Sequence, residues 1–254
     1  MSTIALQDIN WQVVIYNEAK RSGKFAELIR GFYRHQVITE TAKQLGIAPT
    51  ENEIQSAADK FRKVNQLESI TATCQWLEAN FISVEDFQEM INYQLIIDKL
   101  AQHLFSSRVE SYFHQHSTTY MSAVIYEIIF PDRYTAIEIF YALEEGDLTF
   151  ASVADRYITD VELKRRGGYR GEVSRQQLRP ELAAAIFAAT PPQVIEPIES
   201  TLGVHLIRVE EIRRPQLDDF LRDRIINEMF ESWLLENIAA STQQQPISLS
   251  HLVD

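Results

Sequence analysis

The chain has 254 residues, a formal net charge of −12 at pH 7 and a hydrophobic fraction of 45%. A chain of this length can form one large domain or two modest ones, and its apolar content suffices for a buried core. Nucleic acids and anionic membrane surfaces both select basic proteins, so the acidic balance argues against either as a partner. No stretch approaches the roughly 20 consecutive apolar residues of a membrane-spanning helix, so no membrane insertion is expected.

The cysteine content and the N-terminus bear on the compartment. The one cysteine, Cys74, permits no intrachain disulfide, so nothing in the covalent chemistry requires an oxidising environment. Because Cys74 lies in a helical pattern, we expect it to be a packed thiol. Residues 1–8 lack the basic segment and apolar run of a secretory signal, so the expected location is cytoplasmic.

Residues 1 to about 116 have apolar side chains at helical spacing. Gly46 is well placed to end a helix, and Thr50 and Glu53 have the spacing of a capping box that begins another. Ser83 is a good N-cap for a further helix. The first predicted helix carries Leu6, Ile9, Val13 and Tyr16 on one face.

The pattern changes at Tyr120. Residues 123–130 are rich in β-branched and aromatic side chains and end at Pro131, which predicts a strand. Two further strands, 194–198 and 204–210, are expected to form a hairpin around Gly203. Between the first strand and this hairpin, apolar spacing predicts helices near 136–143, 150–157 and 180–189. The order is therefore β-α-α-α-β-β.

The segment 215–240 is again helical and carries more apolar side chains than a solvated helix can expose. The simplest account is that it returns to pack on the N-terminal helices. The predicted fold class is therefore α+β, with a small β-α-α-α-β-β domain inserted in an all-helical domain. The expected parts are residues 1–118 (helical), 119–212 (inserted domain), 213–240 (C-terminal helix) and 241–254 (loose tail).

The segment 167–211 contains the most suggestive residues. Three glycines in Gly167–Gly171 indicate a tight turn or a close approach of the backbone. In the strand that follows Gly203, the side chains of His205, Ile207 and Val209 face one way, because side chains alternate along a strand. A histidine among apolar neighbours on a sheet face is a candidate functional residue.

These residues together resemble the parvulin (PpiC-type) peptidyl-prolyl cis/trans isomerase domain over 120–212. The order and spacing of the matching segments cover the whole domain. The helical remainder is similar in layout to the SurA/PrsA/NifM-like chaperone–isomerases. The matching segments are Ile125–Phe130, Phe150-Ala151, Thr159-Asp160, Gly167-Gly168-x-x-Gly171, Pro180-Glu181-Leu182, Phe187, Pro197-Ile198 and Gly203–Ile207.

The resemblance implies an activity that needs no cofactor and no nucleophile. An X–Pro amide rotates slowly, with a barrier of about 18–20 kcal/mol, because its twisted state loses resonance. An enzyme need only favour the twisted form over both planar ones. The implied partners are unfolded or nascent proline-containing polypeptides, with the helical domain as their cradle.

The resemblance also assigns the candidate catalytic residues. Of the two facing histidines of the family, the second matches His205 and the first falls at Glu127. Glu127 is expected to accept a hydrogen bond from the His205 ring and to favour its charged form. Asp160 matches an acidic position before the glycine turn, where it would be a polar group at the pocket rim or simply a turn residue.

The candidate substrate-binding residues line the implied proline pocket. Arg170 stands where the family usually has leucine, so it would narrow the pocket or recognise an acidic group near the proline. For the other three positions the alternative is plain core packing. The four positions are Arg170, Leu178, Leu182 and Phe187.

Two other clusters have weaker functional interpretations. The basic residues Lys164, Arg165, Arg166 and Arg170 would bind an acidic client or a phosphate, or form a solvated loop. His114 and His116 lie on one face if the chain is extended there, but no third metal ligand is evident, so no metal site is predicted.

Two functions from different classes follow. The first is an isomerase and folding helper that acts on X–Pro bonds. The alternative is a non-catalytic chaperone, or a peptide-maturation or secretion partner, that uses the same fold for client binding. The replacements at Glu127 and Arg170 favour the alternative.

Overall fold

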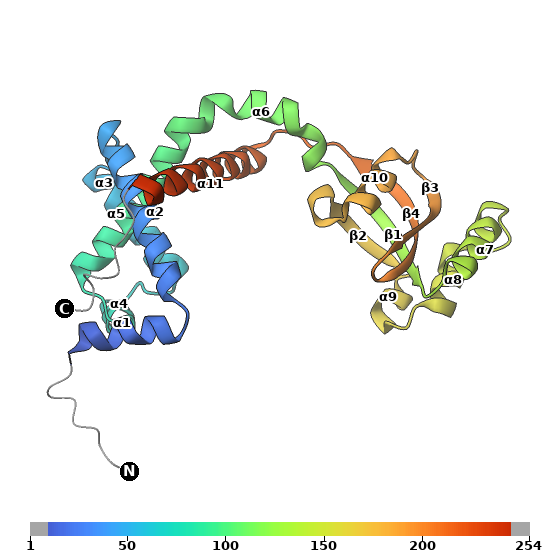
Figure 1. Ribbon diagram of the computed structural model, residues 1–254, viewed down its shortest axis with the longest axis horizontal. Helices are drawn as coiled ribbons and strands as arrows, with labels where there is room; N and C mark the ends of the chain where they lie inside the picture. Colours follow the sequence, from blue (N-terminus) through green and yellow to red (C-terminus); the bar gives the residue numbers. More distant parts are fainter. Residues whose placement is uncertain (1–9, 245–254) are drawn as a thin grey trace, which may run out of the picture. The chain divides into compact units, whose positions relative to one another are not determined.

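The computed structural model describes residues 10–244 (Figure 1). Contacts divide the chain into two compact units. The helical unit joins the N-terminal helices up to Val109 to the C-terminal segment from Arg222, and the α+β unit is Glu110–Leu221. The predicted α+β fold class, with a small sheet-containing domain inserted in a helical one, is confirmed.

The helical unit contains six α-helices within the described residues. The predicted positions Leu6 and Ile9 lie outside those residues. The C-terminal helix runs to Gln244, so residues 241–244, expected in a loose tail, are helical; 245–254 lie outside the described part. The helices are α1 (Trp11–Arg21), α2 (Phe25–Gln44), α3 (Glu51–Val64), α4 (Ile70–Ala79), α5 (Val84–Phe105) and α11 (Asp219–Gln244).

The capping box predicted at the start of α3 is present. The Thr50 backbone N–H donates to Glu53 Oε2 at 2.7 Å, and Thr50 Oγ1 accepts from the Glu53 N–H at 3.3 Å. Behind this start, α3 packs on α5 around a core of buried and half-buried apolar side chains. Its buried members are Ala58, Leu77, Phe87 and Ile91.

The helix α11 packs within the helical unit. Arg34 of α2 donates two hydrogen bonds to the Glu231 carboxylate, at 2.8 and 2.7 Å. This pairing raises the pKa of Arg34 and lowers the pKa of Glu231. Buried apolar side chains of α11, including Ile225 and Phe230, account for the apolar richness of this segment.

The packing predicted for Cys74 is wrong, because its side chain is exposed. The covered stripe of α4 consists of Ala72, Thr73, Trp76 and Leu77. At 100° per residue, Cys74 projects from the other side of the helix.

The α+β unit contains four strands rather than the three predicted. The missed strand is β2 (Tyr169–Ser174), which pairs with β1 (Ser122–Phe130) at one edge of the sheet. The predicted hairpin is present as β3 (Gln193–Ser200) and β4 (Gly203–Arg213). All neighbours are antiparallel, in the order β2-β1-β4-β3.

Five helices accompany the sheet. The short α9 was not predicted, so the order of major elements is β-α-α-α-β-α-β-β rather than β-α-α-α-β-β. The unit begins before the predicted residue 119 because α6 lies almost wholly in it. The helices are α6 (Val109–His116), α7 (Arg133–Glu144), α8 (Phe150–Tyr157), α9 (Val161–Arg165) and α10 (Pro180–Ala188).

The two faces of the sheet have separate cores. One face, with Ile128 of β1 and Leu206 of β4, is covered by α7 and α8. The opposite face, with Ile125 and Ile207, is covered by α10 (Figure 1). Among the described helices, none has the length and the apolar run that crossing a membrane requires.

Candidate active site

Glu127 and His205 lie side by side on the face of the sheet that α10 covers. In the β1–β4 register Glu127 is opposite Ile207 and Ile129 is opposite His205, so both polar side chains emerge on one face. The His205 Nδ1 and Glu127 Oε1 atoms are 2.7 Å apart. Within residues 10–244, these are the two polar or charged residues that are buried.

Arg170 approaches the same carboxylate from the glycine turn. Its Nε lies 3.3 Å from Glu127 Oε2, and half of its side chain (51%) is exposed. The β1–β2 register shifts so that Ile125 pairs with Gly171 and Tyr126 pairs with Tyr169, which leaves Arg170 as the extra residue of a bulge. A bulge re-aims the side chain that it carries, and here the side chain meets Glu127.

The glycine turn is shaped by its contact with the backbone of β1. The Glu127 N–H donates to the Gly168 carbonyl at 2.9 Å. Gly168 has φ +85°, and a Cβ atom there would lie 3.1 Å from the Glu127 carbonyl oxygen. Only glycine adopts this conformation cheaply and allows so close an approach. The glycine turn therefore holds Arg170 next to Glu127.

Ser200 completes the polar network on the other side of the histidine. Its Oγ lies 2.6 Å from His205 Nε2 and accepts a hydrogen bond from the Leu202 N–H at 3.0 Å. The hydroxyl hydrogen is then available for Nε2, which leaves the Nδ1 hydrogen to donate to Glu127. We call Arg170, Glu127, His205 and Ser200 the polar network.

Ser200 was missed from the sequence, and the pairing of Arg170 with Glu127 was missed too. Two signals point to them. Ser200 carries a hydroxyl just after the first strand of the predicted hairpin, so it faces the start of the second strand, where His205 lies. A lone carboxylate on an apolar strand requires a cation or several hydrogen bonds, because burying an unpaired charge is costly.

The predicted pocket residues separate into buried and accessible ones. Leu182 is buried in the core beneath α10, which is the core-packing alternative. Leu178 and Phe187 are half-buried at the edge of the same core. The guanidinium of Arg175 stacks over the Phe187 ring, with 4.9 Å between its carbon and the ring centroid. Their role in gripping a proline ring stays a prediction.

Asp160 lies at the N-cap of α9, where its Oδ1 accepts from the Leu163 N–H at 2.7 Å. This is the turn-residue alternative. The contacts of residues 10–244 do not link its side chain to Glu127 or His205. A catalytic role for Asp160 therefore stays a prediction.

The basic residues of α9 are mostly paired locally. Lys164 lies 3.3 Å from Asp155, and Arg165 lies 2.9 Å from Glu162. These exposed pairs favour the interpretation of a solvated segment.

His114 and His116 lie in the helix α6, so the extended geometry that would align them is absent. His116 stacks on Tyr112, and its Nδ1 lies 2.9 Å from the Tyr112 carbonyl oxygen. In the part of the chain that the structure describes, no group of three or more His, Cys, Asp or Glu side chains could hold a metal ion.

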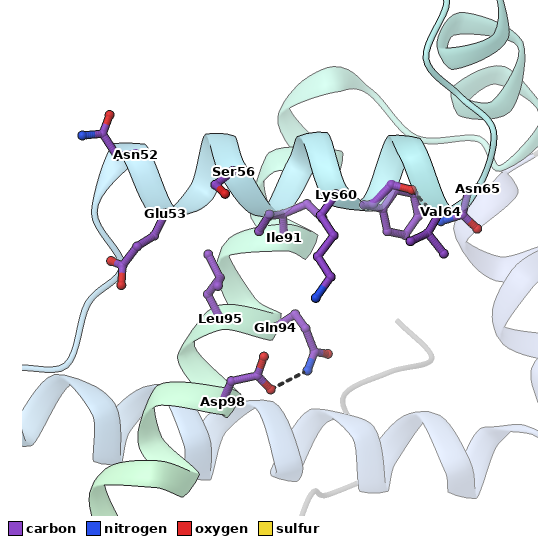
Figure 2. A pocket seen from close by; sticks show the side chains of 12 residues that line it. Asn52, Glu53, Ser56, Lys60, Val64, Asn65, Ile91, Gln94, Leu95 and Asp98 are labelled. Carbon is purple, nitrogen blue, oxygen red and sulfur yellow. Dashed lines mark hydrogen bonds between the residues drawn. The ribbon is translucent and has the colours of Figure 1, made fainter. Parts of the chain in front are cut away.

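The helical unit has a separate apolar groove between α3 and α5, with a volume of about 680 Å³. Ala57, Phe61 and Val64 of α3 line one side, and Ile91 and Leu95 of α5 line the other. Figure 2 shows Lys60 pointing from α3 toward α5 at the groove's polar rim, where Gln94 donates a hydrogen bond to Asp98. An accessible apolar surface of this kind suits apolar segments of an unfolded chain.

Comparison with known proteins finds a family match for the sheet-containing unit. Residues 133–211 match the rotamase family, described as the PPIC-type PPIASE domain. The match covers the glycine turn, α10 and the hairpin, and it begins just after β1.

Relatives extend the likeness to the helical unit. The foldase protein PrsA of Caldanaerobacter subterraneus is 23% identical over 234 residues, which are 88% of this chain and 68% of the relative. The PrsA of Halalkalibacterium halodurans is 26% identical over 212 residues, 78% of this chain and 63% of that protein. This chain thus spans about two thirds of their length.

A crystal structure of PrsA from Bacillus cereus has the same fold. Its TM-score is 0.54 at 18% identity, over 92% of this chain and 88% of that one. The resemblance found in the sequence is confirmed. Residues 133–211 therefore form a parvulin-type peptidyl-prolyl isomerase domain, and the helical unit that carries it is similar to that of the PrsA foldases.

Proposed function

We propose that this chain is a peptidyl-prolyl cis/trans isomerase that also assists the folding of unfolded polypeptides. The observation that carries the proposal is the buried Glu127–His205 pair on the α10 face of the sheet, with His205 inside the matched PPIC-type domain. A buried ion-pairing network is costly to maintain, and its desolvated groups mark candidate functional sites.

The polar network supplies what rotation about an X–Pro bond requires. No covalent bond has to form, so the site must only interact better with the twisted amide than with the planar ones. Twisting shifts charge between the carbonyl oxygen and the prolyl nitrogen. Donors and a carboxylate that are already held in position respond to this shift without reorganising. His205 is almost fully buried, so its contribution is to fix Glu127 and Ser200.

The substitution Glu127→Gln tests the catalytic role of the network. Glutamine keeps an acceptor for the His205 N–H but removes the charge, so the fold should survive. We expect kcat/KM in a prolyl-peptide isomerisation assay to fall about 100-fold, the usual scale for a group of this kind. Glu172→Gln is the matched control, because Glu172 pairs with Arg213 at the edge of the sheet. Unchanged turnover in Glu127→Gln would remove Glu127 from the mechanism.

The groove between α3 and α5 supports client binding by the helical unit. Val64 lines the groove and is 72% exposed, so Val64→Asp adds a charge there with little cost to the fold. We expect it to weaken suppression of client aggregation while isomerisation is unchanged. Ile70→Asp is the control, because Ile70 is 85% exposed and lies outside the groove. Equal losses in both variants would argue against the groove.

The second candidate is a non-catalytic chaperone. Two observations favour it: Leu182 is packed into the core, and Arg170, at a position that the resemblance assigns to the pocket, is held by Glu127. The two activities should be measured on the same preparation. Aggregation suppression without isomerisation would overturn the enzyme proposal and leave the chaperone.

Two finer expectations remain predictions. The clients would be unfolded or nascent polypeptides, and those that contain proline would be the substrates of isomerisation. The cytoplasmic location expected from the sequence would be tested by fractionating cells that express the protein.

A further inference from the structure

The segment around the glycine turn is basic in an otherwise acidic protein. Residues 160–180 contain six Lys and Arg but three Asp and Glu, whereas the whole chain has a net charge of −12. The excess of positive charge is therefore concentrated where β2 leads into α10.

Three arginines of this segment contact three different elements: the strand β1, the helix α10 and the β3–β4 turn. Arg170 reaches Glu127, at 3.3 Å. Arg175 lies over the ring of Phe187. Arg179 Nη1 donates to the Thr201 hydroxyl at 2.6 Å, in the hairpin turn next to Ser200. Guanidinium groups thus contact the polar network, the candidate pocket residue Phe187 and the hairpin turn.

We call Arg170, Arg175 and Arg179 the arginine rim. Nearby carboxylates do not neutralise the positive charge of this rim. Within residues 10–244, neither Arg175 nor Arg179 has a carboxylate at ion-pair distance. Glu172 and Glu199, on the flanking strands, pair with Arg213 and Arg133 instead.

The remaining acidic groups leave the rim positively charged. Glu127 is shared between Arg170 and His205, and Glu181 lies in the first turn of α10. The three guanidinium groups therefore outnumber these two carboxylates.

We infer that the isomerase site selects X–Pro bonds in which X is acidic, and that Arg170 is the specificity-determining residue. This inference rests on the proposed isomerase function. The network faces the rotating amide, whose carbonyl belongs to residue X, so a cation attached to the network lies next to the X side chain. Glu127 holds Arg170 through its Nε atom. Because the Arg170 side chain is half-exposed, the remaining guanidinium N–H groups can donate to a client carboxylate.

The test uses a series of peptides that differ only in X. Glu–Pro is compared with Gln–Pro, its neutral counterpart of the same shape, and with Lys–Pro. We expect kcat/KM to be about fivefold higher for Glu–Pro than for Gln–Pro, and lowest for Lys–Pro, as for a partly exposed charge pair. The preference should shrink when the ionic strength is raised, because salt screens exposed charges.

Variants assign the preference to Arg170. Arg170→Leu restores the residue usual in the family and should bring the Glu-to-Gln ratio close to one. The ratio within one variant cancels any general loss of activity from exposing Glu127. Arg156→Leu removes the same charge but lies against Tyr157 on the opposite face of the sheet, so it should keep the ratio.

The outcomes separate this inference from the proposed function. Equal turnover for all three peptides, or a preference that survives Arg170→Leu, would overturn the inference and keep the isomerase. No acceleration for any peptide would overturn the isomerase. In that case, peptide binding followed by NMR decides the inference, since tighter binding of Glu–Pro than of Gln–Pro, lost in Arg170→Leu, supports it and equal binding overturns it.

Discussion

The α+β unit buries two polar side chains, Glu127 and His205, whereas the helical unit exposes many large apolar ones. Among the exposed residues of the helical unit are Phe32, Val64 and Phe81. Each unit thus departs from the usual apolar-inside, polar-outside distribution in the opposite direction. Departures of both kinds cost stability, so they are expected at functional sites. The difference indicates chemistry on a peptide bond in one unit and adhesion to unfolded chains in the other.

The largest expected effect concerns the hairpin that positions His205. Gly203 has φ +129°, and a Cβ atom there would lie 2.6 Å from the Phe130 carbonyl oxygen and 2.9 Å from Ile129 Cγ2. Gly203→Ala should therefore destabilise the α+β unit by about 4 kcal/mol, from backbone strain and overpacking together. Urea unfolding measures the change.

A glycine in the helical unit provides the contrast. Gly31 lies within α2, and a Cβ atom there meets nothing within 4 Å. Gly31→Ala should stabilise that unit by about 1 kcal/mol, because alanine favours helices over glycine. If both substitutions changed the free energy of unfolding with the same sign, the difference in space around Gly203 and Gly31 would not govern stability.

The next effect tests whether the units unfold separately. Ile207 is fully buried in the core beneath α10, so Ile207→Ala should cost about 3 kcal/mol. The three tryptophans, Trp11, Trp76 and Trp233, all lie in the helical unit. Their fluorescence should therefore report an unchanged unfolding transition in Ile207→Ala. The NMR signals of the α+β unit should disappear at a lower urea concentration than in the unsubstituted protein.

Leu100→Ala is the reciprocal substitution. Leu100 is fully buried in α5 of the helical unit, so this variant should shift the tryptophan transition. A shift of the tryptophan signal by Ile207→Ala of equal size would mean that the two units unfold together.

The smallest effect concerns a surface charge of the helical unit. Hydrogen bonds from Lys99, and then from the Thr50 backbone and hydroxyl, lower the pKa of Glu53 from 4.5 to about 2. The folded pKa is depressed, so this contribution to stability is complete above the ordinary pKa of a glutamate. It is lost as the pH falls through the folded value.

Lys99→Met should raise the Glu53 pKa toward its ordinary value, measured by NMR titration of the side-chain carboxyl. Gln55→Met, on the same helix, is the control and should leave the titration unchanged. A Glu53 pKa that did not move in Lys99→Met would show that the capping box alone depresses it.

Much of the fold was predictable because it depends on short-range patterns. The capping box at Thr50 and Glu53 and the strand that begins at Ser122 are determined by residues close together in the chain. The strand β2 was not predictable in this way. Its sequence, Tyr-Arg-Gly-Glu-Val-Ser, has only two large apolar side chains, Tyr169 and Val173, with a glycine between them, and it becomes a strand by pairing with β1. Pairing at a sheet edge depends on what the rest of the chain offers.

The same distinction between local pattern and long-range contact applies to the candidate active site. By itself, the sequence determined the α+β fold class, the face of the strand on which His205 lies, and, through its resemblance to the parvulins, the choice of Glu127 as its partner. Only the tertiary structure decided that Arg170 joins this pair and that Ser200 holds the far side of the ring. It also decided that Leu182 is buried and that Cys74 is exposed. The physical reason is that side-chain alternation is a local property of the backbone. The reach of Arg170 instead depends on a bulge between strands whose paired residues are more than 40 positions apart.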